Sequence, residues 1–239
     1  MYTDLSPSRV VGILGGMGPS ATADFYTKLI AHTPASVDQE HLRVVIWADP
    51  TVPSRQDALL SNGQDPSPWL AAGLQRLQDS GAEIIVVPCN TVHGYLPPIM
   101  DGQPTEFISI IDTTIQAVNW TANNHAIGLL ATDGALLSGI YQEALSDAGY
   151  GVIQPSAQDQ AQLMNIVHSV KAGNITPELH QDMRRILATL ENQGADTAIV
   201  GCTELSTLLQ HATLEGSMTL VDPAVELALA TINRARQHP

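Results

Sequence analysis

The chain of 239 residues contains only two cysteines, Cys89 and Cys202, and both occur in similar local sequences. Cys89 lies in PCNT and Cys202 in GCTE, each shortly after an apolar run. A thiolate can accept a proton and a thiol can donate one, so two thiols on opposite faces of one carbon could carry a proton through a stereocentre. We therefore predict that the two cysteines form one proton-transfer site.

Other uses of the cysteines fit the sequence less well. A cysteine hydrolase would need a Cys–His pair and would leave the second, equivalent cysteine without a role. A zinc site would need three or four clustered ligands, and only Cys89 with His93 comes near that pattern, so we expect no metal. Each cysteine could also be a small buried hydrophobic residue, and this alternative stays open.

The elements that must position the cysteines alternate along the chain between strand and helix patterns. Short, continuous apolar runs are typical of parallel strands that are covered on both faces. We expect strands at 10–14, 43–47, 84–87, 107–111, 126–130, 197–200 and 219–221, and helices at about 20–31, 67–80, 113–122, 136–148, 157–172, 176–193 and 223–236. Alternation of this kind predicts an α/β fold with largely parallel sheets.

An internal repeat predicts how these elements are divided. The segment GAEIIVVPC at 81–89 aligns with GADTAIVGC at 194–202, and GILGGMG at 12–18 aligns with GLLATDG at 128–134. We therefore expect two pseudo-symmetric α/β lobes, with the active site in the cleft between them. The expected lobes are 1–112, completed by a C-terminal helix at 222–239, and 113–221.

Both cysteines are expected at the carboxyl ends of parallel strands, where ligands of open α/β sheets bind. Each precedes a segment that could start a helix. Backbone N–H groups at a helix start favour a thiolate, so the sequence predicts thiols of lowered pKa.

The charge balance bears on possible partners. A formal net charge of −14 argues against nucleic acid and against an anionic membrane surface. No apolar run approaches the roughly 18 to 20 residues of a membrane span, and the first residues lack the pattern of a secretory signal, so we expect a cytoplasmic protein. Because Lys and Arg total only 10, those beside a motif are candidates for binding an anionic substrate.

Five motifs in order, GILGGMGPSATADFY, DPTVPSRQ, PCNTVH, VKAGN and GCTEL, resemble the aspartate/glutamate racemase family, above all its cofactor-independent aspartate racemases. The resemblance covers nearly the whole chain. It implies two α/β lobes, no cofactor, no metal, a homodimer, and a small acidic amino acid, aspartate or glutamate, as substrate. It also implies that Cys89 and Cys202 are the acid/base pair.

The resemblance further implies which residues bind the substrate. Those expected around it are Met17, Arg55, Gln56, Asn90, Thr91, Thr132, Lys171 and Thr203, with Arg55, Gln56 and Lys171 holding the distal carboxylate. An arginine fork and a lysine charge suit that task. Possible supporting residues are Asp49, His93 and Glu204. Glutamate racemases of the cell-wall type usually have a histidine after GCT, where this chain has Glu204, and this favours aspartate.

Several functional alternatives stay open. The same resemblance allows a glutamate or broad-specificity amino-acid racemase, or a related maleate isomerase, hydantoin racemase or decarboxylase. A non-catalytic two-lobed binder of small molecules would leave the paired thiols without a function. The segment GMGPSA at 16–21 also satisfies a dinucleotide-binding pattern, but the acidic residue expected about 20 residues later is poorly placed.

Overall fold

The computed structural model describes residues 8–59, 62–210 and 218–237 of the chain. The chain divides into two compact units. The N-terminal unit comprises Met1–Thr113 and Ala224–Pro239, and the C-terminal unit comprises Thr114–Pro223. The lobe boundaries expected from the sequence, 1–112 with 222–239 and 113–221, remain a prediction.

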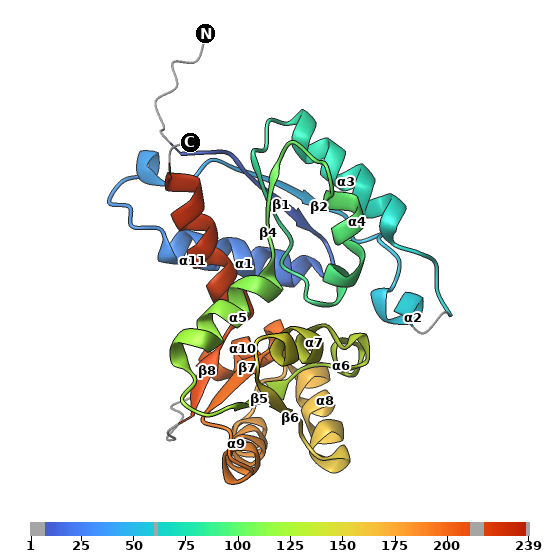
Figure 1. The fold of residues 1–239 in the computed structure, drawn as a ribbon, viewed down its shortest axis with the longest axis vertical. Helices are drawn as coiled ribbons and strands as arrows, with labels where there is room; N and C mark the ends of the chain where they lie inside the picture. Colours follow the sequence, from blue (N-terminus) through green and yellow to red (C-terminus); the bar gives the residue numbers. More distant parts are fainter. Residues whose placement is uncertain (1–7, 60–61, 211–217, 238–239) are drawn as a thin grey trace. The chain divides into compact units, whose positions relative to one another are not determined.

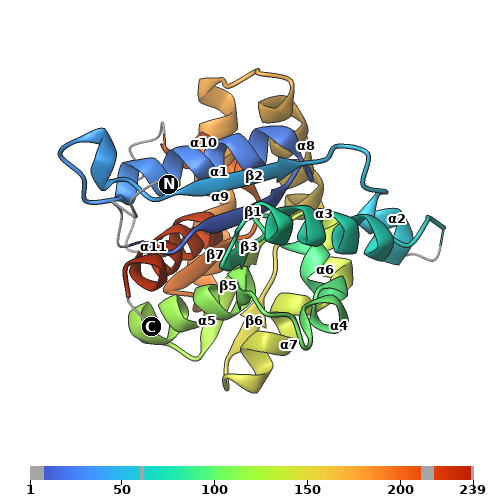
Figure 2. The same ribbon diagram turned by 90° about the horizontal axis from the view of Figure 1, so that it is seen from above.

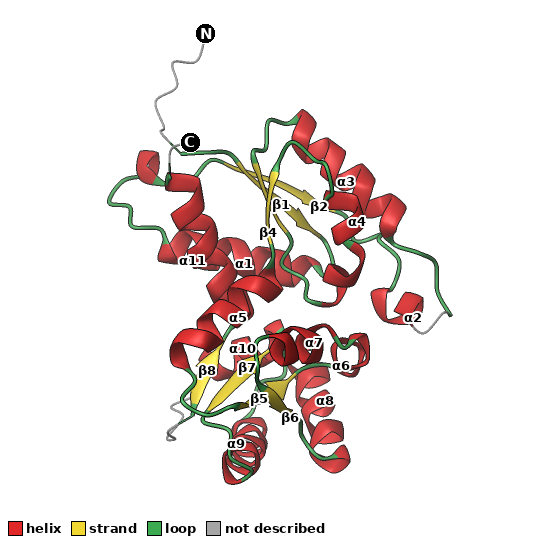
Figure 3. Ribbon diagram, viewed as in Figure 1, coloured by secondary structure: helices red, strands yellow, loops and turns green. Residues whose placement is uncertain are grey.

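Each unit contains a four-stranded parallel sheet flanked by helices (Figures 1 and 3), which confirms the expected α/β class. The N-terminal sheet has the order β2-β1-β3-β4 and the C-terminal sheet the order β6-β5-β7-β8. The strands are β1 (Val11–Gly15), β2 (Val44–Ala48), β3 (Ile84–Val86), β4 (Glu106–Ile108), β5 (Ala126–Leu130), β6 (Gly151–Ile153), β7 (Thr197–Val200) and β8 (Thr219–Val221).

The two sheets repeat each other in register as well as in order. Val11 of β1 lies opposite Ile84 of β3, and Ile127 of β5 lies opposite Thr197 of β7. These pairs occupy corresponding positions in the aligned repeat. The next pair along each sheet also corresponds, with β3 pairing to β4 as β7 pairs to β8. The sequence repeat therefore describes one sheet topology that is used twice.

The helices follow the strands in both units (Figure 1). They are α1 (Pro19–His32), α2 (Arg55–Leu59), α3 (Ser67–Asp79), α4 (Pro97–Met100), α5 (Ile110–Thr121), α6 (Asp133–Ser138), α7 (Ile140–Asp147), α8 (Ala157–Lys171), α9 (Pro177–Asn192), α10 (Thr203–Gln210) and α11 (Pro223–Arg236), with short 3-10 turns η1 (Asp38–Glu40) and η2 (Thr91–Tyr95). Within the described part of the chain, no helix has both the length and the apolar run needed to cross a bilayer.

Local chemistry explains where the elements differ from the expected ones. The helix expected at 136–148 is two helices, α6 and α7, because Gly139 adopts a left-handed conformation with φ of +69° between them. The strand expected at 107–111 ends at Ile108, and α5 takes over from Ile110. Strand β6 is only three residues long and was missed by the apolar-run criterion.

In the N-terminal unit, α1 and α3 cover opposite faces of the sheet. Along β2, Val45 and Trp47 pack into the cluster formed with α3, whereas Val44 lies beside Tyr26 and Ile30 of α1. Successive side chains of a strand point to opposite faces, so the two helices lie on different sides. Figure 2 shows both helices running beside the strands.

In the C-terminal unit, the core lies between the sheet and the helices α8, α9 and α10. Leu163, Ile186 and Leu205 come from these three helices and pack with Leu130 and Val200 of the strands. Cys202 belongs to the same cluster. The candidate acid/base residue is thus fixed by the main core of its unit.

Candidate active site

Both cysteines follow interior strands of their sheets. Cys89 comes shortly after β3 and Cys202 shortly after β7, the corresponding strands of the two units. Met17 follows β1 and Thr132 follows β5 in the same way. Within each unit, the predicted residues therefore gather at the carboxyl edge of the sheet, where α/β enzymes bind their ligands.

Arg55 is the charged neighbour of Cys89 and is held in a fixed position. Its Nη1 donates to the carbonyl of Pro53 at 3.1 Å and, at 3.4 Å, to that of Val52, and its Nη2 donates to the carbonyl of Met17 at 3.1 Å. Its Nε is buried and has no hydrogen-bond partner among the described residues. Buried donors are normally paired, so this Nε–H is available to a ligand. Together with the second N–H of Nη2 it can donate two parallel hydrogen bonds to a carboxylate.

His93 supports the loop that carries Cys89. The N–H of Ile110 donates to Nε2 of His93 at 3.2 Å, so Nε2 is the acceptor and the proton lies on Nδ1. Nδ1 in turn donates to the carbonyl of Cys89, 2.9 Å away. Burial lowers the pKa of His93 to about 4, opposed by the bond to the Cys89 carbonyl. His93 is thus a neutral brace on the backbone of Cys89.

Replacing His93 with glutamine should change how stability depends on pH. The folded pKa of about 4 lies below the ordinary value of 6.5, so the contribution of the neutral ring is complete above pH 6.5 and is lost as the pH falls towards 4. We expect the stability advantage of the wild type over H93Q to shrink by about 3 kcal/mol across that range. Urea unfolding at several pH values measures it. The exposed His168→Gln is the control, and an advantage that does not vary with pH would contradict the neutral brace.

The glycine turn after β1 has a shape that only glycine accommodates. Gly16 has φ of +94°, and a Cβ there would lie 2.3 Å from the backbone nitrogen of Asp49. The N–H of Gly16 donates to the hydroxyl of Thr22 at 2.9 Å, and that hydroxyl donates to the carbonyl of Gly18 at 3.0 Å. The turn is therefore clamped between α1 and the segment after β2, and it fixes the backbone of Met17, which is buried.

Gly16→Ala should destabilise the N-terminal unit by about 2 to 4 kcal/mol, because a left-handed conformation and a steric clash add together. Thermal and urea unfolding measure the loss. Gly94→Ala is the matched control, since a Cβ at Gly94 meets no atom within 4 Å. Equal stability of the two variants would show that the turn opens at little cost.

Asp49 has a local role in the structure. Its Oδ1 accepts from the backbone N–H of Thr51 at 2.9 Å and from the Thr51 hydroxyl at 2.6 Å. These bonds lower the pKa of Asp49. The carboxylate thus stabilises the turn that leads from β2 towards Arg55.

Cys202 has an acidic neighbour. Its Sγ donates to Oε2 of Glu204 at 3.0 Å, and the hydroxyl of Thr203 donates to the same oxygen at 3.1 Å. Nζ of Lys171 lies 3.8 Å from the other carboxylate oxygen, Oε1. Glu204 therefore gathers three residues that the sequence analysis named separately. The Lys171 side chain is 59% exposed, so its ion pair with Glu204 contributes little to stability.

Two further residues position the loop after β5. The hydroxyl of Thr132 accepts from the N–H of Ala135 at 3.4 Å and so caps α6. Gln160 of α8 donates to the carbonyl of Ala131 at 3.1 Å and to Oδ1 of Asp133 at 2.8 Å. Sequence analysis missed Gln160 and also Thr22 of the glycine turn. No sequence signal identifies either residue. Gln160 contacts a loop that is distant along the chain, and the contact of Thr22 depends on how the glycine turn folds back onto α1.

The expectation of lowered thiol pKa values was wrong. Burial raises the pKa of Cys89, and the Arg55 charge and the N–H of Val92 only partly oppose it. Burial, followed by the Glu204 charge, raises the pKa of Cys202 to about 12. The backbone N–H groups that the helix-start argument invoked are present, but desolvation of the anion outweighs them.

The remaining predicted residues are distributed as follows. Asn90 and Thr91 are half-buried at the start of η2, next to Cys89. The backbone of Gln56 lies in α2, but its side chain is outside the described part of the structure. In the described ranges, no three His, Cys, Asp or Glu side chains are grouped so that they could hold a metal ion.

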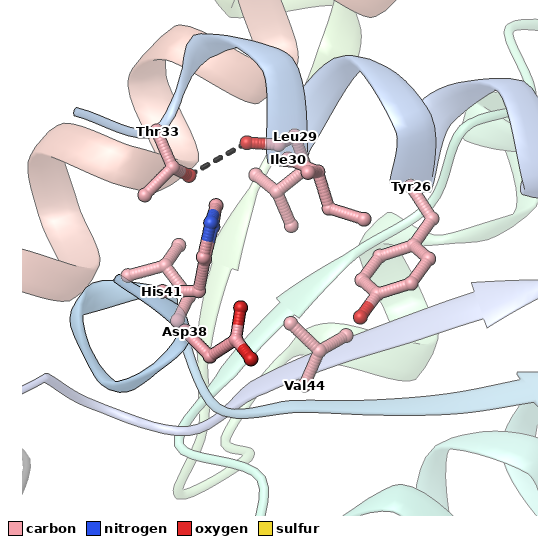
Figure 4. A pocket seen from close by; sticks show the side chains of 8 residues that line it. Tyr26, Leu29, Ile30, Thr33, Asp38, His41 and Val44 are labelled. Atoms are coloured by element: carbon pink, nitrogen blue, oxygen red, sulfur yellow. Dashed lines mark hydrogen bonds between the residues drawn. The ribbon is translucent and has the colours of Figure 1, made fainter. Parts of the chain in front are cut away.

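A cavity of about 300 Å³ lies elsewhere, between α1 and β2 of the N-terminal unit (Figure 4). Tyr26 and Ile30 of α1 face Val44 of β2 across it, and Asp38 and His41 close one side. None of the predicted site residues lines it. The cavity is therefore separate from both cysteine loops.

Comparison with known proteins identifies the family. The family model described as Asp/Glu/hydantoin racemase matches residues 14–231. The chain belongs to this family. As a member it is an isomerase of the racemase type, and the family resemblance of the five motifs is confirmed.

Individual relatives agree with the family assignment. The aspartate racemase of Picrophilus torridus superposes with a TM-score of 0.80 at 30% identity, covering 95% of this chain and 94% of that one. The broad-specificity amino-acid racemase RacX of Bacillus subtilis is 28% identical over 231 residues, covering 94% of this chain and 97% of that protein. A glutamate racemase of Desulforudis audaxviator is 32% identical over 164 residues, covering 67% of this chain and 57% of that protein.

Proposed function

We propose that this racemase interconverts the L and D forms of a small acidic amino acid by proton transfer at Cα between Cys89 and Cys202. Aspartate is the proposed substrate. The observation that carries the proposal is the repeat in register: each unit holds one cysteine after the same strand of the same sheet topology. One sulfur removes the α-proton and the other delivers a proton to the opposite face. The proposal needs the two units to bring these sulfurs to one carbon.

The surroundings of Cys89 support binding of an anion. Arg55 has an unpaired buried Nε–H beside a guanidinium that three backbone carbonyls fix in place. The distal carboxylate of the substrate can accept from this Nε and from Nη2 of the fixed guanidinium, which helps to orient Cα. Asn90 and Thr91 next to Cys89, and Thr203 next to Cys202, supply polar groups for the α-carboxylate. The Thr203 hydroxyl would exchange its bond to Glu204 for one to the substrate. As negative charge develops at Cα, these fixed donors stabilise the carbanion.

Lys171 is the least fixed residue of the proposed site. Its ammonium group pairs with Glu204 and its side chain is largely exposed. A second substrate carboxylate can compete with Glu204 for this charge. We assign Lys171 to the distal carboxylate on that basis, and Gln56 because the family resemblance implies it.

The experiment supplies L- or D-aspartate in deuterium oxide and follows optical activity by circular dichroism and α-deuteration by NMR. We expect both enantiomers to lose optical activity with incorporation of deuterium at Cα. Retention of optical activity and of the α-proton with aspartate, glutamate and neutral amino acids would overturn the proposal. Conversion of maleate to fumarate with amino acids inert would favour an isomerase instead.

A broad-specificity racemase is the second candidate. The name of the RacX protein states a broad specificity. This chain aligns with 97% of the RacX protein but with only 57% of the glutamate racemase. Rates with aspartate, glutamate, lysine and alanine under identical conditions separate the candidates. A rate with aspartate that exceeds the rate with alanine by less than about tenfold would favour a broad-specificity racemase.

The cellular setting and assembly belong to the same proposal. The mechanism needs two free thiols, and both cysteines are free in the structure. A reducing compartment such as the cytoplasm preserves them. We also propose a homodimer, as the family resemblance implies, and sedimentation velocity tests it.

A further inference from the structure

Cys89 and Cys202 have neighbours of opposite charge, and this makes the repeated site asymmetric. We propose that Glu204 is a positioning residue that keeps Cys202 protonated in the resting enzyme, so that Cys202 is the resting acid and Cys89, beside Arg55, is the resting base. This inference rests on the proposed function and extends it with an assignment of roles. Sequence symmetry alone makes the two sulfurs equivalent.

The geometry around Cys202 favours the thiol form. An ionised carboxylate has only acceptor sites, so the 3.0 Å contact from Sγ to Oε2 of Glu204 requires a hydrogen on the sulfur. A thiolate would face the carboxylate as a second anion at that distance. Thr203 donates to the same oxygen and so helps to fix Glu204, and Lys171 lies 3.8 Å from the other oxygen.

Cys202 belongs to an apolar core cluster of its unit. Its neighbours from α8 and α9, such as Leu163, Ile166 and Met183, are apolar. Burial and the Glu204 charge therefore act in the same direction on the thiol. The pKa of about 12 agrees with this reading.

Cys89 is surrounded differently. Arg55 from α2 brings a positive charge that opposes the effect of burial on its pKa. His93 from η2 is neutral and contacts the carbonyl of Cys89 through Nδ1. Of the two thiols, Cys89 thus has the surroundings in which a thiolate costs less.

The proton balance closes without any co-reactant. The Cys89 thiolate takes the α-proton of the substrate, and the S–H bond of Cys202 breaks as its proton adds to the opposite face of the carbanion. The enzyme is left with a Cys89 thiol and a Cys202 thiolate. Loss of a proton from Cys89 to water and gain of one by Cys202 restore the resting state.

Steady-state activity is a poor test of this assignment. The two enantiomers have equal free energies in water, so their equilibrium constant is one and kcat/KM must be equal in both directions at every pH. The roles have to be measured on the thiols themselves. The chain has only two cysteines, so each single alanine variant leaves one thiol to follow.

The experiment measures the pH–rate profile of alkylation by iodoacetamide, read by mass spectrometry, for Cys202 in C89A and for Cys89 in C202A. We expect Cys89 to reach its thiolate plateau at lower pH than Cys202. Adding Glu204→Gln to C89A should shift the Cys202 profile down by about one pH unit, which raises its rate at pH 8 about three- to tenfold after allowance for the weaker nucleophile. Adding Arg55→Gln to C202A should shift the Cys89 profile upwards.

Controls separate ionisation from access to the sulfur. Easier access raises the rate by the same factor at all pH values, whereas a changed pKa moves the profile along the pH axis. Glu178→Gln, an exposed acidic residue in the first turn of α9, should leave the Cys202 profile unchanged. An unshifted Cys202 profile in the Glu204→Gln variant, or a Cys202 that ionises before Cys89, would overturn the inference.

The outcome is independent of the proposed reaction because no substrate is present. If racemisation fails but the profiles shift as expected, the proposed function is wrong and the charge asymmetry stands. If racemisation occurs and the profiles do not shift, the function stands and the role of Glu204 is wrong.

Discussion

Cys202→Ala is expected to lower the rate of aspartate racemisation by at least about 10³-fold, because proton delivery to one face of Cα loses its acid. Cys89→Ala should do the same for the other face. The decisive result is the pattern of isotope exchange. With one sulfur left, the α-proton can be removed and returned on a single face, so each variant should deuterate one enantiomer without inverting it. The two variants should select opposite enantiomers.

Chiral chromatography coupled to mass spectrometry measures inversion and deuteration in the same sample. Cys→Ser variants are the matched controls for shape, since they keep a small polar side chain but lose the more acidic thiol. Both variants exchanging the same enantiomer would contradict two bases on opposite faces. A Cys202→Ala variant that racemises at the wild-type rate would remove Cys202 from the mechanism.

Arg55→Gln is expected to lower kcat/KM about 10²- to 10³-fold, which is typical for the loss of one preorganised charge-stabilising donor. Two effects add. The unpaired Nε–H that can receive a carboxylate is lost, and so is the charge that opposes the rise in the pKa of Cys89. The activity profile should therefore also move to higher pH.

Arg55→Lys separates the two effects. Lysine keeps the charge but cannot donate simultaneously to the carbonyls of Met17, Val52 and Pro53 and to a substrate. We expect Arg55→Lys to reverse part of the shift of the activity profile to higher pH, but to restore little of the substrate binding. Arg184→Gln, which removes an exposed arginine of α9, is the control. A kcat/KM of Arg55→Gln within threefold of the wild type would show that this residue does not hold the substrate.

Glu204 connects the specificity argument with the mechanism. The sequence comparison treats it as a difference from the histidine of cell-wall glutamate racemases. In the structure its carboxylate receives hydrogen bonds from both Cys202 and Thr203. A histidine there could be donor or acceptor at the sulfur, whereas an ionised carboxylate can only accept. The inference that Glu204 keeps Cys202 protonated follows from this difference in chemistry.

The sequence by itself determined the fold class and the repeat. Short apolar β-branched runs bury both faces, so β1, β5, β7 and β8 lie within a residue or two of the runs that predict them. The alignment of GAEIIVVPC with GADTAIVGC predicts corresponding strands, and the registers of β3 and β7 agree with it. The five ordered motifs were enough to name the family.

Only the tertiary structure decided the chemistry around each sulfur. Burial, the Arg55 charge beside Cys89 and the contact of Cys202 with Glu204 depend on which side chains fold back onto the strand ends. A sequence pattern gives the order of residues, but the cost of an anion depends on how much water is excluded around it. For that reason the helix-start argument gave the wrong direction for both thiols, and His93 proved to be a neutral support for Cys89.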